Sequence, residues 1–195
     1  MSEAVSATPG TRVVDGRVVP EAGTWEIDPS HQSFEFIARH LMAKVRGRFP
    51  GASGAATIAE RPEDSTLEIE IDANSIDTKD DTRDAHMRSN DFFGVEDHPT
   101  ISFRSTGVRP GKGESEWQVD GDLTIKGTTR PVTVDVEFLG GAIDPWGNQR
   151  IGFSGVVPEV DREEWGLTWN APLEAGGFLL SKSVRLEIEA ELIRK

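Results

Sequence analysis

The 195-residue sequence predicts an all-β protein of about eight antiparallel strands and one short helix. Apolar and polar residues alternate over most of the chain, as in strands with one buried face and one face in water. The clearest case is 117–138, whose two alternating arms meet near Gly127 and predict a hairpin in which Pro131 begins the returning strand. Between 78 and 93 a stretch rich in Asp and Arg, without Gly or Pro, favours the helix.

The other elements follow in chain order. Residues 1–23 have no sustained periodicity and predict a flexible arm, with at most one short edge strand at 12–19. Residues 24–195 are expected to form one domain. Alternation predicts strands at 25–40 (interrupted at Asp28–Pro29), 55–59, 67–73, 101–105, 117–126, 132–138, 151–157 and 184–192.

Periodicity alone fits either a closed barrel or a sandwich of two sheets, because both have strands with one apolar face. About eight strands closed into a barrel leave room for side chains or for one small ligand. In that arrangement the helix can cover one end of the barrel.

Composition excludes several classes of protein. The chain has no cysteine, which rules out disulfides and thiol catalysis. Its net charge of −13 argues against a nucleic-acid surface and disfavours anionic lipid headgroups, although a local basic spot is compatible with it. No apolar run approaches the roughly 20 residues of a membrane span. The N-terminal segment lacks the features of a secretory signal, so we expect a cytoplasmic protein.

Side chains that could carry chemistry do not form a recognised catalytic or metal-binding pattern. The four histidines lack the close pairing of zinc proteases. Alternation turns His40 inward, where it is either a hydrogen-bonded structural histidine or a contact to a ligand head. Arg83, Asp84 and His86 favour an ion-pair network that fixes the helix over a catalytic cluster. Trp165 and Trp169 fit a cavity mouth and a packed core equally well. We therefore predict no catalytic residue, metal or cofactor.

A series of short motifs runs in order from about residue 25 to 192. They are Trp25-x-Ile27-Asp28-x-x-His31, Ser33-Phe34-x-Phe36-x-x-Arg39-His40-Leu41, Val45-x-Gly47-x-Phe49, Ser75-Ile76-Asp77-Thr78, Arg83-Asp84-x-His86, Ser89-x-Asp91-Phe92-Phe93, Pro99-x-Ile101-x-Phe103, Gly121-x-Leu123-Thr124-Ile125-Lys126-Gly127 and Arg162-x-x-Trp165-Gly166-Leu167. With these motifs the chain resembles the YceI-like family of polyisoprenoid-binding, lipocalin-like proteins. Gln32 departs from the pattern, which has serine directly after the histidine.

The resemblance implies a lipocalin-like barrel whose apolar channel holds a long-chain isoprenoid lipid, a quinone or a similar fatty amphiphile, and it suggests a homodimer. Several members of the family carry an export signal that we do not see in this sequence. We therefore do not assign their periplasmic carrier role to this protein. Binding, rather than catalysis, is the leading hypothesis. The alternatives are an enzyme acting on an isoprenoid-type substrate, with His40 or His86 as the acid–base group, and a barrel with a filled core.

Alternation independently supports an apolar interior. Ala38, Gly121 and Gly155 are small enough to leave space within it. Burial of one isoprene unit contributes about 4 kcal/mol gross, so a few units offset the cost of association. The expected ligand-binding residues are Phe34, Phe36, Ala38, His40, Ile71, Phe92, Phe93, Ile101, Phe103, Leu123, Ile125, Val134, Phe153 and Trp165.

Overall fold

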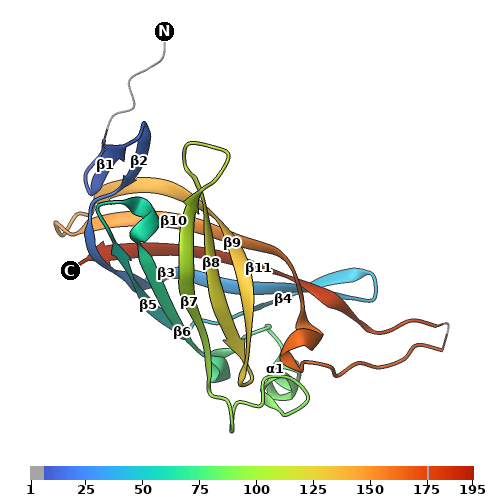
Figure 1. The fold of residues 1–195 in the computed structure, drawn as a ribbon. Coiled ribbons are helices and arrows are strands. Elements are labelled where there is room, and N and C mark those ends of the chain that lie inside the picture. Colours follow the sequence, from blue (N-terminus) through green and yellow to red (C-terminus); the bar gives the residue numbers. More distant parts are fainter. Residues whose placement is uncertain (1–6, 175) are drawn as a thin grey trace.

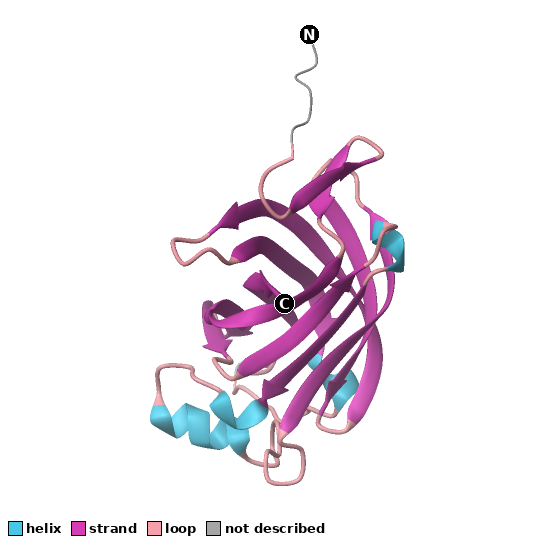
Figure 2. Cartoon of the chain, turned by 90° about the vertical axis from the view of Figure 1, so that its left-hand side faces the viewer, coloured by secondary structure: helices cyan, strands magenta, loops and turns pink. Residues whose placement is uncertain are grey.

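The computed structural model describes residues 7–174 and 176–195, and within them eight antiparallel strands close into a barrel (Figures 1 and 2). The expectation of a lipocalin-like barrel is therefore confirmed. The strands, in their order around the barrel, are β3 (Gly23–His40), β5 (Ala52–Ile58), β6 (Thr66–Asp72), β7 (Thr100–Pro110), β8 (Glu116–Ile125), β9 (Thr128–Ile143), β10 (Gln149–Asp161) and β11 (Leu180–Arg194).

The barrel closes because β11 pairs with β10 on one edge and with β3 on the other. β3 bends where the register with β11 shifts, between Ile27 and Gln32, so the break at Asp28–Pro29 lies within one long strand. The outer half of β3 pairs with a ninth strand of the sheet, β4 (Ala43–Arg48), while its first residues pair with β5. β3 and β4 therefore project as a hairpin beyond the closed barrel (Figure 1).

The hairpin predicted at 117–138 is formed by β8 and β9. Its turn is Lys126–Gly127, and both residues have positive φ values, as the tight turns that suit twisted strands require. β9 already begins at Thr128, so Pro131 lies inside the strand rather than at its start. Pro131 pairs with Asp122 on β8. On its other side, β9 pairs with β10 only from Asp135 onward, so the missing N–H of Pro131 removes no hydrogen bond between β9 and β10.

The predicted helix is present but shorter than expected. α1 spans Asp81–Arg88, and the side chain of Asp80 caps it by accepting a 2.9 Å hydrogen bond from the backbone of Arg83. At the other end, the backbone N–H and the hydroxyl of Ser89 both donate to the carbonyl of His86. Three short 3₁₀ turns, η1 (Pro62–Asp64), η2 (Ala73–Ser75) and η3 (Arg162–Trp165), complete the fold.

The single edge strand expected at 12–19 is instead a two-stranded hairpin of β1 (Thr11–Val14) and β2 (Arg17–Pro20). Its turn, Asp15–Gly16, has two positive φ values, and Asp-Gly between valine pairs is a strong hairpin signal that our sequence analysis missed. Arg12 donates to the backbone oxygens of Ala59 and Glu60. These bonds tie the hairpin to the loop after β5. Residues 1–6 of the predicted arm lie outside the described residues, and the domain boundary at 24 stays a prediction.

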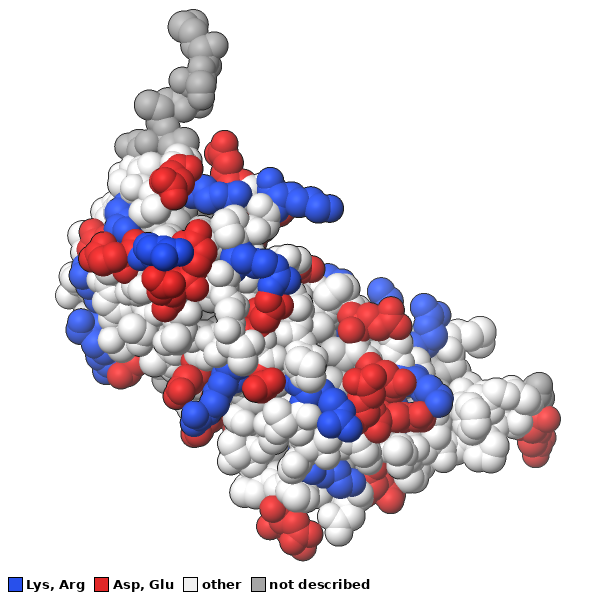
Figure 3. All heavy atoms as spheres, in the orientation of Figure 1, with Lys and Arg blue, Asp and Glu red and all other residues white. Residues whose placement is uncertain are grey.

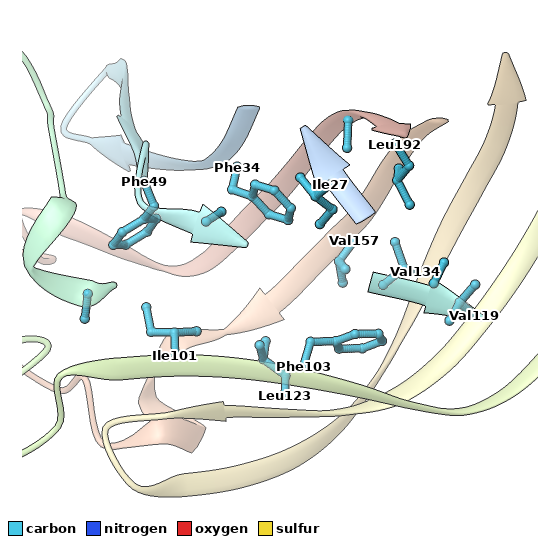
Figure 4. Close-up of a cluster of buried hydrophobic side chains, with 14 of the residues drawn as sticks. Ile27, Phe34, Phe49, Ile101, Phe103, Val119, Leu123, Val134, Val157 and Leu192 are labelled. Atoms are coloured by element: carbon cyan, nitrogen blue, oxygen red, sulfur yellow. The ribbon is translucent and has the colours of Figure 1, made fainter. Parts of the chain in front are cut away.

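The apolar faces of the strands meet inside the barrel, where Phe34, Phe103 and Leu123 are buried (Figure 4). Gly121 does not leave the space we expected there. A Cβ at this position would lie 2.3 Å from the ring of Phe103 and 2.6 Å from the carbonyl oxygen of Arg104. Gly121 is therefore required for the close packing of Phe103 against β8, rather than for ligand space.

Candidate ligand cavity

A cavity of about 510 Å³ runs through the barrel interior, within the usual size range of small-molecule sites. Its wall is mostly apolar and comes from the inner faces of the barrel strands. Each strand contributes alternate residues, as the sequence pattern requires. All fourteen residues predicted to bind ligand line this one cavity, although ligand contact by them stays a prediction. Gly155 also lines it, as expected for a small inward residue.

The N-terminal hairpin and α1 lie at opposite ends of the barrel (Figures 1 and 2). At the hairpin end, Val19 and Pro20 of β2 line the cavity beside Pro62 of η1. Val19 is almost completely buried, so β2 forms part of the wall at this end. β2 is only four residues long, so it has no alternation of apolar and polar residues that could have revealed these two positions from the sequence.

Aromatic rings narrow the cavity near α1. The ring centroid of Phe93 lies 5.4 Å from that of Phe49 and 6.5 Å from that of Phe36. Phe92 packs at 5.5 Å from Trp169. Trp169, whose role the sequence left open, lines the cavity, and so does Trp165, whose indole N–H donates to the carbonyl of Leu123.

Hydrogen bonds from α1 to one threonine fix the helix in place. Buried Asp84 accepts from the backbone N–H of Thr78 at 2.8 Å and from its hydroxyl at 2.5 Å. Arg83 donates through Nε to the same hydroxyl, at 2.7 Å, and through Nη2 to the Thr78 carbonyl, at 2.6 Å. The two side chains thus secure α1 as expected, but by binding Thr78 rather than by pairing with each other.

The histidines at this end also occupy defined positions. Nε2 of His86 lies 2.8 Å from Oδ2 of Asp91, and its ring meets that of Trp169 edge-on at 4.6 Å between centroids. Both His86 and His40 line the cavity, so the inward orientation expected for His40 is correct. These groups, with Thr78 and Arg83, give the α1 end a more polar wall than the middle of the barrel.

Arg162 of η3 is the most deeply buried charged side chain in the wall of the cavity. Its Nε donates to the carbonyl of Ser181 at 2.9 Å, and its Nη1 donates to the carbonyl of Leu167. Burial lowers the pKa of its guanidinium. These bonds join η3 to the start of β11 and shape the wall beside Trp165.

A second polar cluster lies on the outer side of the barrel. Arg150 of β10 binds Asp28 of β3 at 2.6 Å, Asp144 of the β9–β10 turn at 2.8 Å and Glu191 of β11 at 3.1 Å. Asp28 also contacts Nδ1 of His31 at 2.7 Å. Oxygen and nitrogen atoms of Asp28, His31 and Glu191 lie close enough together to suggest a cation site, but the guanidinium of Arg150 already supplies the positive charge.

An antiparallel barrel around an apolar cavity is the architecture of the lipocalin-like class of proteins. The YceI-like domain model matches residues 25–192, and the chain belongs to this family. Two UPF0312 proteins of Staphylococcus aureus, from strains bovine RF122 / ET3-1 and USA300, are each 39% identical to it over 167 residues, which is 84% of this chain and 94% of theirs. The sequence-based recognition of the family is therefore confirmed.

Solved structures show the same fold. BcnA of Burkholderia cenocepacia superposes with a TM-score of 0.74 at 19% identity, over 85% of this chain and 98% of that one. A YCEI protein of Campylobacter jejuni gives 0.68 at 26% identity, over 80% and 90%. A polyisoprenoid binding domain from Saccharophagus degradans gives 0.66 at 15% identity, over 90% and 100%. Among the described residues, no helix has the length and apolar character to span a membrane.

Proposed function

We propose that the barrel binds a long-chain isoprenoid lipid, a quinone or a similar amphiphile, and that it carries or sequesters this ligand in its cavity. The apolar wall of the cavity is the observation that carries the proposal. Each buried isoprene unit contributes about 4 kcal/mol gross, so one to four units offset an association cost of about 4–15 kcal/mol. The polyisoprenoid binding domain with the same fold supports this ligand class.

We favour binding over an enzymatic role because the cavity wall is mostly apolar, and because most polar groups at its α1 end serve to hold the local structure. Asp84 and Arg83 hold Thr78, and His86 contacts Asp91. A carboxylate beside a histidine also occurs around catalytic bases, so the contact between His86 and Asp91 does not decide between the two roles, and the apolar wall is the argument for binding. The alternative of an enzyme would need His40 or His86 to act on the head of the same ligand.

Extraction of the purified protein with organic solvent, followed by mass spectrometry, tests the proposal. We expect a prenyl or acyl chain in roughly stoichiometric amount. In a second measurement, geranylgeraniol should displace a bound fluorescent fatty acid at micromolar concentration or below. If native material carries no lipid, and the emptied protein binds neither probe, the barrel has a filled core and the proposal fails.

The proposal includes two expectations that rest on the sequence alone, a cytoplasmic location and a homodimer. Light scattering at micromolar concentration should give about twice the 21.3 kDa mass of one chain. A mass near that of one chain would remove the homodimer from the proposal and leave the ligand class untouched.

A further inference from the structure

Two chain segments project side by side from the α1 end of the barrel (Figure 1). One segment is the β3–β4 turn, residues 39–44, and the other, residues 176–182, leads into β11. We term these two segments together the paired tip. The backbone N–H of Leu41 donates to the carbonyl of Leu179 at 2.9 Å, and Leu180 pairs with His40. The two segments therefore form one continuous surface.

The paired tip exposes large apolar side chains. Met42 is 92% exposed, Phe178 62% and Leu41 47%. Single exposed apolar residues are common, but three at the end of one projection are unfavourable in water, which points to an interaction surface.

Charge on the paired tip is opposite in sign to that of the whole protein. Arg39, Lys44 and Lys182 are its charged residues, in a chain of net charge −13. Lys182 pairs with Glu163 at 2.7 Å, whereas among the described residues Arg39 and Lys44 form no ion pair. Glu174 is the nearest acidic residue along the chain. With Glu163 and Glu174 counted, the tip still has three cations against two carboxylates, and Figure 3 shows basic and acidic side chains side by side along this part of the molecule. The net positive charge of the tip therefore comes chiefly from Arg39 and Lys44.

The paired tip is continuous with the cavity. His40, Leu179 and Leu180 belong to the tip and also line the cavity. A lipid layer into which Met42 and Phe178 are inserted would therefore lie next to the apolar wall of the cavity. An apolar chain could then pass directly between the layer and the cavity. A ligand transferred there would avoid a passage through water, which costs about 0.8 kcal/mol for each exposed methylene.

We propose that the paired tip docks on an anionic lipid surface, with Leu41, Met42 and Phe178 inserted among the lipids and Arg39 and Lys44 at the headgroups. Docking would allow a ligand to pass between the lipid layer and the cavity, and this purpose rests on the proposed lipid-binding function. A lipid surface fits better than a protein partner, because three side chains at a narrow end are far fewer than the roughly 20–30 residues per side of a stable protein interface.

Sedimentation with vesicles tests the proposal. The probes are vesicles of phosphatidylcholine alone and of phosphatidylcholine with 30% phosphatidylglycerol. We expect the protein to bind the anionic vesicles more tightly, and 0.5 M sodium chloride to weaken this binding. The double variant Arg39→Gln/Lys44→Gln should bind about 30-fold more weakly, from about 1 kcal/mol for each cationic side chain at such a surface.

The double variant Met42→Ser/Phe178→Ser should lose at least 10-fold in vesicle affinity without loss of folding, because both side chains are largely exposed. The matched control is Trp146→Ser, in the β9–β10 turn at the other end of the barrel. Trp146 is also exposed, and its replacement should leave vesicle binding unchanged.

Binding of a fluorescent fatty acid in solution, measured on the same variants, separates docking from the lipid-binding function. Retained fatty-acid binding with lost vesicle binding supports the proposal. Equal binding to both vesicle types, or undiminished binding by the tip variants, would overturn it. A fall from dimer to monomer in the Met42→Ser/Phe178→Ser variant would also overturn it, by assigning the tip to a second copy of the chain. Absence of fatty-acid binding in every protein would instead refute the lipid-binding function.

Discussion

Replacement of Arg150 by methionine should lower the melting temperature by about 10 °C. The variant keeps most of the apolar stem of the side chain but removes the cation from two carboxylates whose side chains are only 9% (Asp28) and 5% (Asp144) exposed. Removal of one partner from a buried ion pair is strongly destabilising, because it leaves the other charge uncompensated. Thermal unfolding followed by circular dichroism measures the change.

The matched control is Arg104→Met. Arg104 pairs with Glu68 at 3.6 Å, and both side chains are mostly exposed. Exposed pairs of this kind contribute little, so the melting temperature should fall by no more than about 3 °C. Equal losses in the two variants would show that the Arg150 cluster is no more than a surface network.

The effect of Arg150→Met should depend on pH in a defined direction. Hydrogen bonds from Arg150 and His31 hold the pKa of Asp28 well below its usual range. For Asp144, burial alone would raise the pKa, but hydrogen bonds from Asn148 and Arg150 outweigh it and the pKa is again low. Because both values lie below the ordinary 3.8, the stabilisation is complete above about pH 5 and is lost as the pH falls below about 4. The difference between the variant and the parent should therefore shrink at acid pH.

Arg150 illustrates which contacts the sequence could not predict. Asp28 and Arg150 are 122 positions apart, and their contact depends on the register between β3, β11 and β10. The side-chain period of two predicts which face of a strand is buried, but not which strand lies beside it. The inward sides of the main barrel strands could thus be predicted, whereas the polar cluster on the outside could not.

Two further differences between the sequence-based expectation and the structure have local causes. The hairpin of β1 and β2 is too short for a periodicity signal, and the informative feature was the dipeptide Asp15–Gly16. Gly121 had the right inward orientation, but sequence alone could not reveal that Phe103 packs directly over it. By contrast, Phe34, Phe36, Ala38 and His40 occupy alternate positions of one strand, so their common place in the cavity wall followed from the pattern.

Replacement of Ala38 by tryptophan is expected to weaken lipid binding at least 10-fold. Ala38 lines the cavity between Phe36 and His40 on β3, opposite Val45 and Val184 of the neighbouring strands. An indole group at this position would occupy part of the 510 Å³ that a prenyl chain needs. Displacement of a bound fluorescent fatty acid measures the loss, and far-ultraviolet circular dichroism should still show a β protein.

The matched control for this variant is Arg39→Trp, one residue further along β3. Its side chain is exposed and points away from the cavity, so an indole group at this position should leave the affinity for a fatty acid in solution unchanged. Equal occupancy in Ala38→Trp and the parent would contradict the placement of the ligand along β3.

The stability of lipid-free Ala38→Trp separates an open cavity from a filled core. In a filled core the indole group would be overpacked, at a cost of about 1–3 kcal/mol, and the melting temperature would fall by several degrees. In an open cavity the added apolar surface has room, so the melting temperature should stay the same or rise. A variant that gains or keeps thermal stability while it loses lipid affinity would show that the space filled by the indole is the space that a ligand uses.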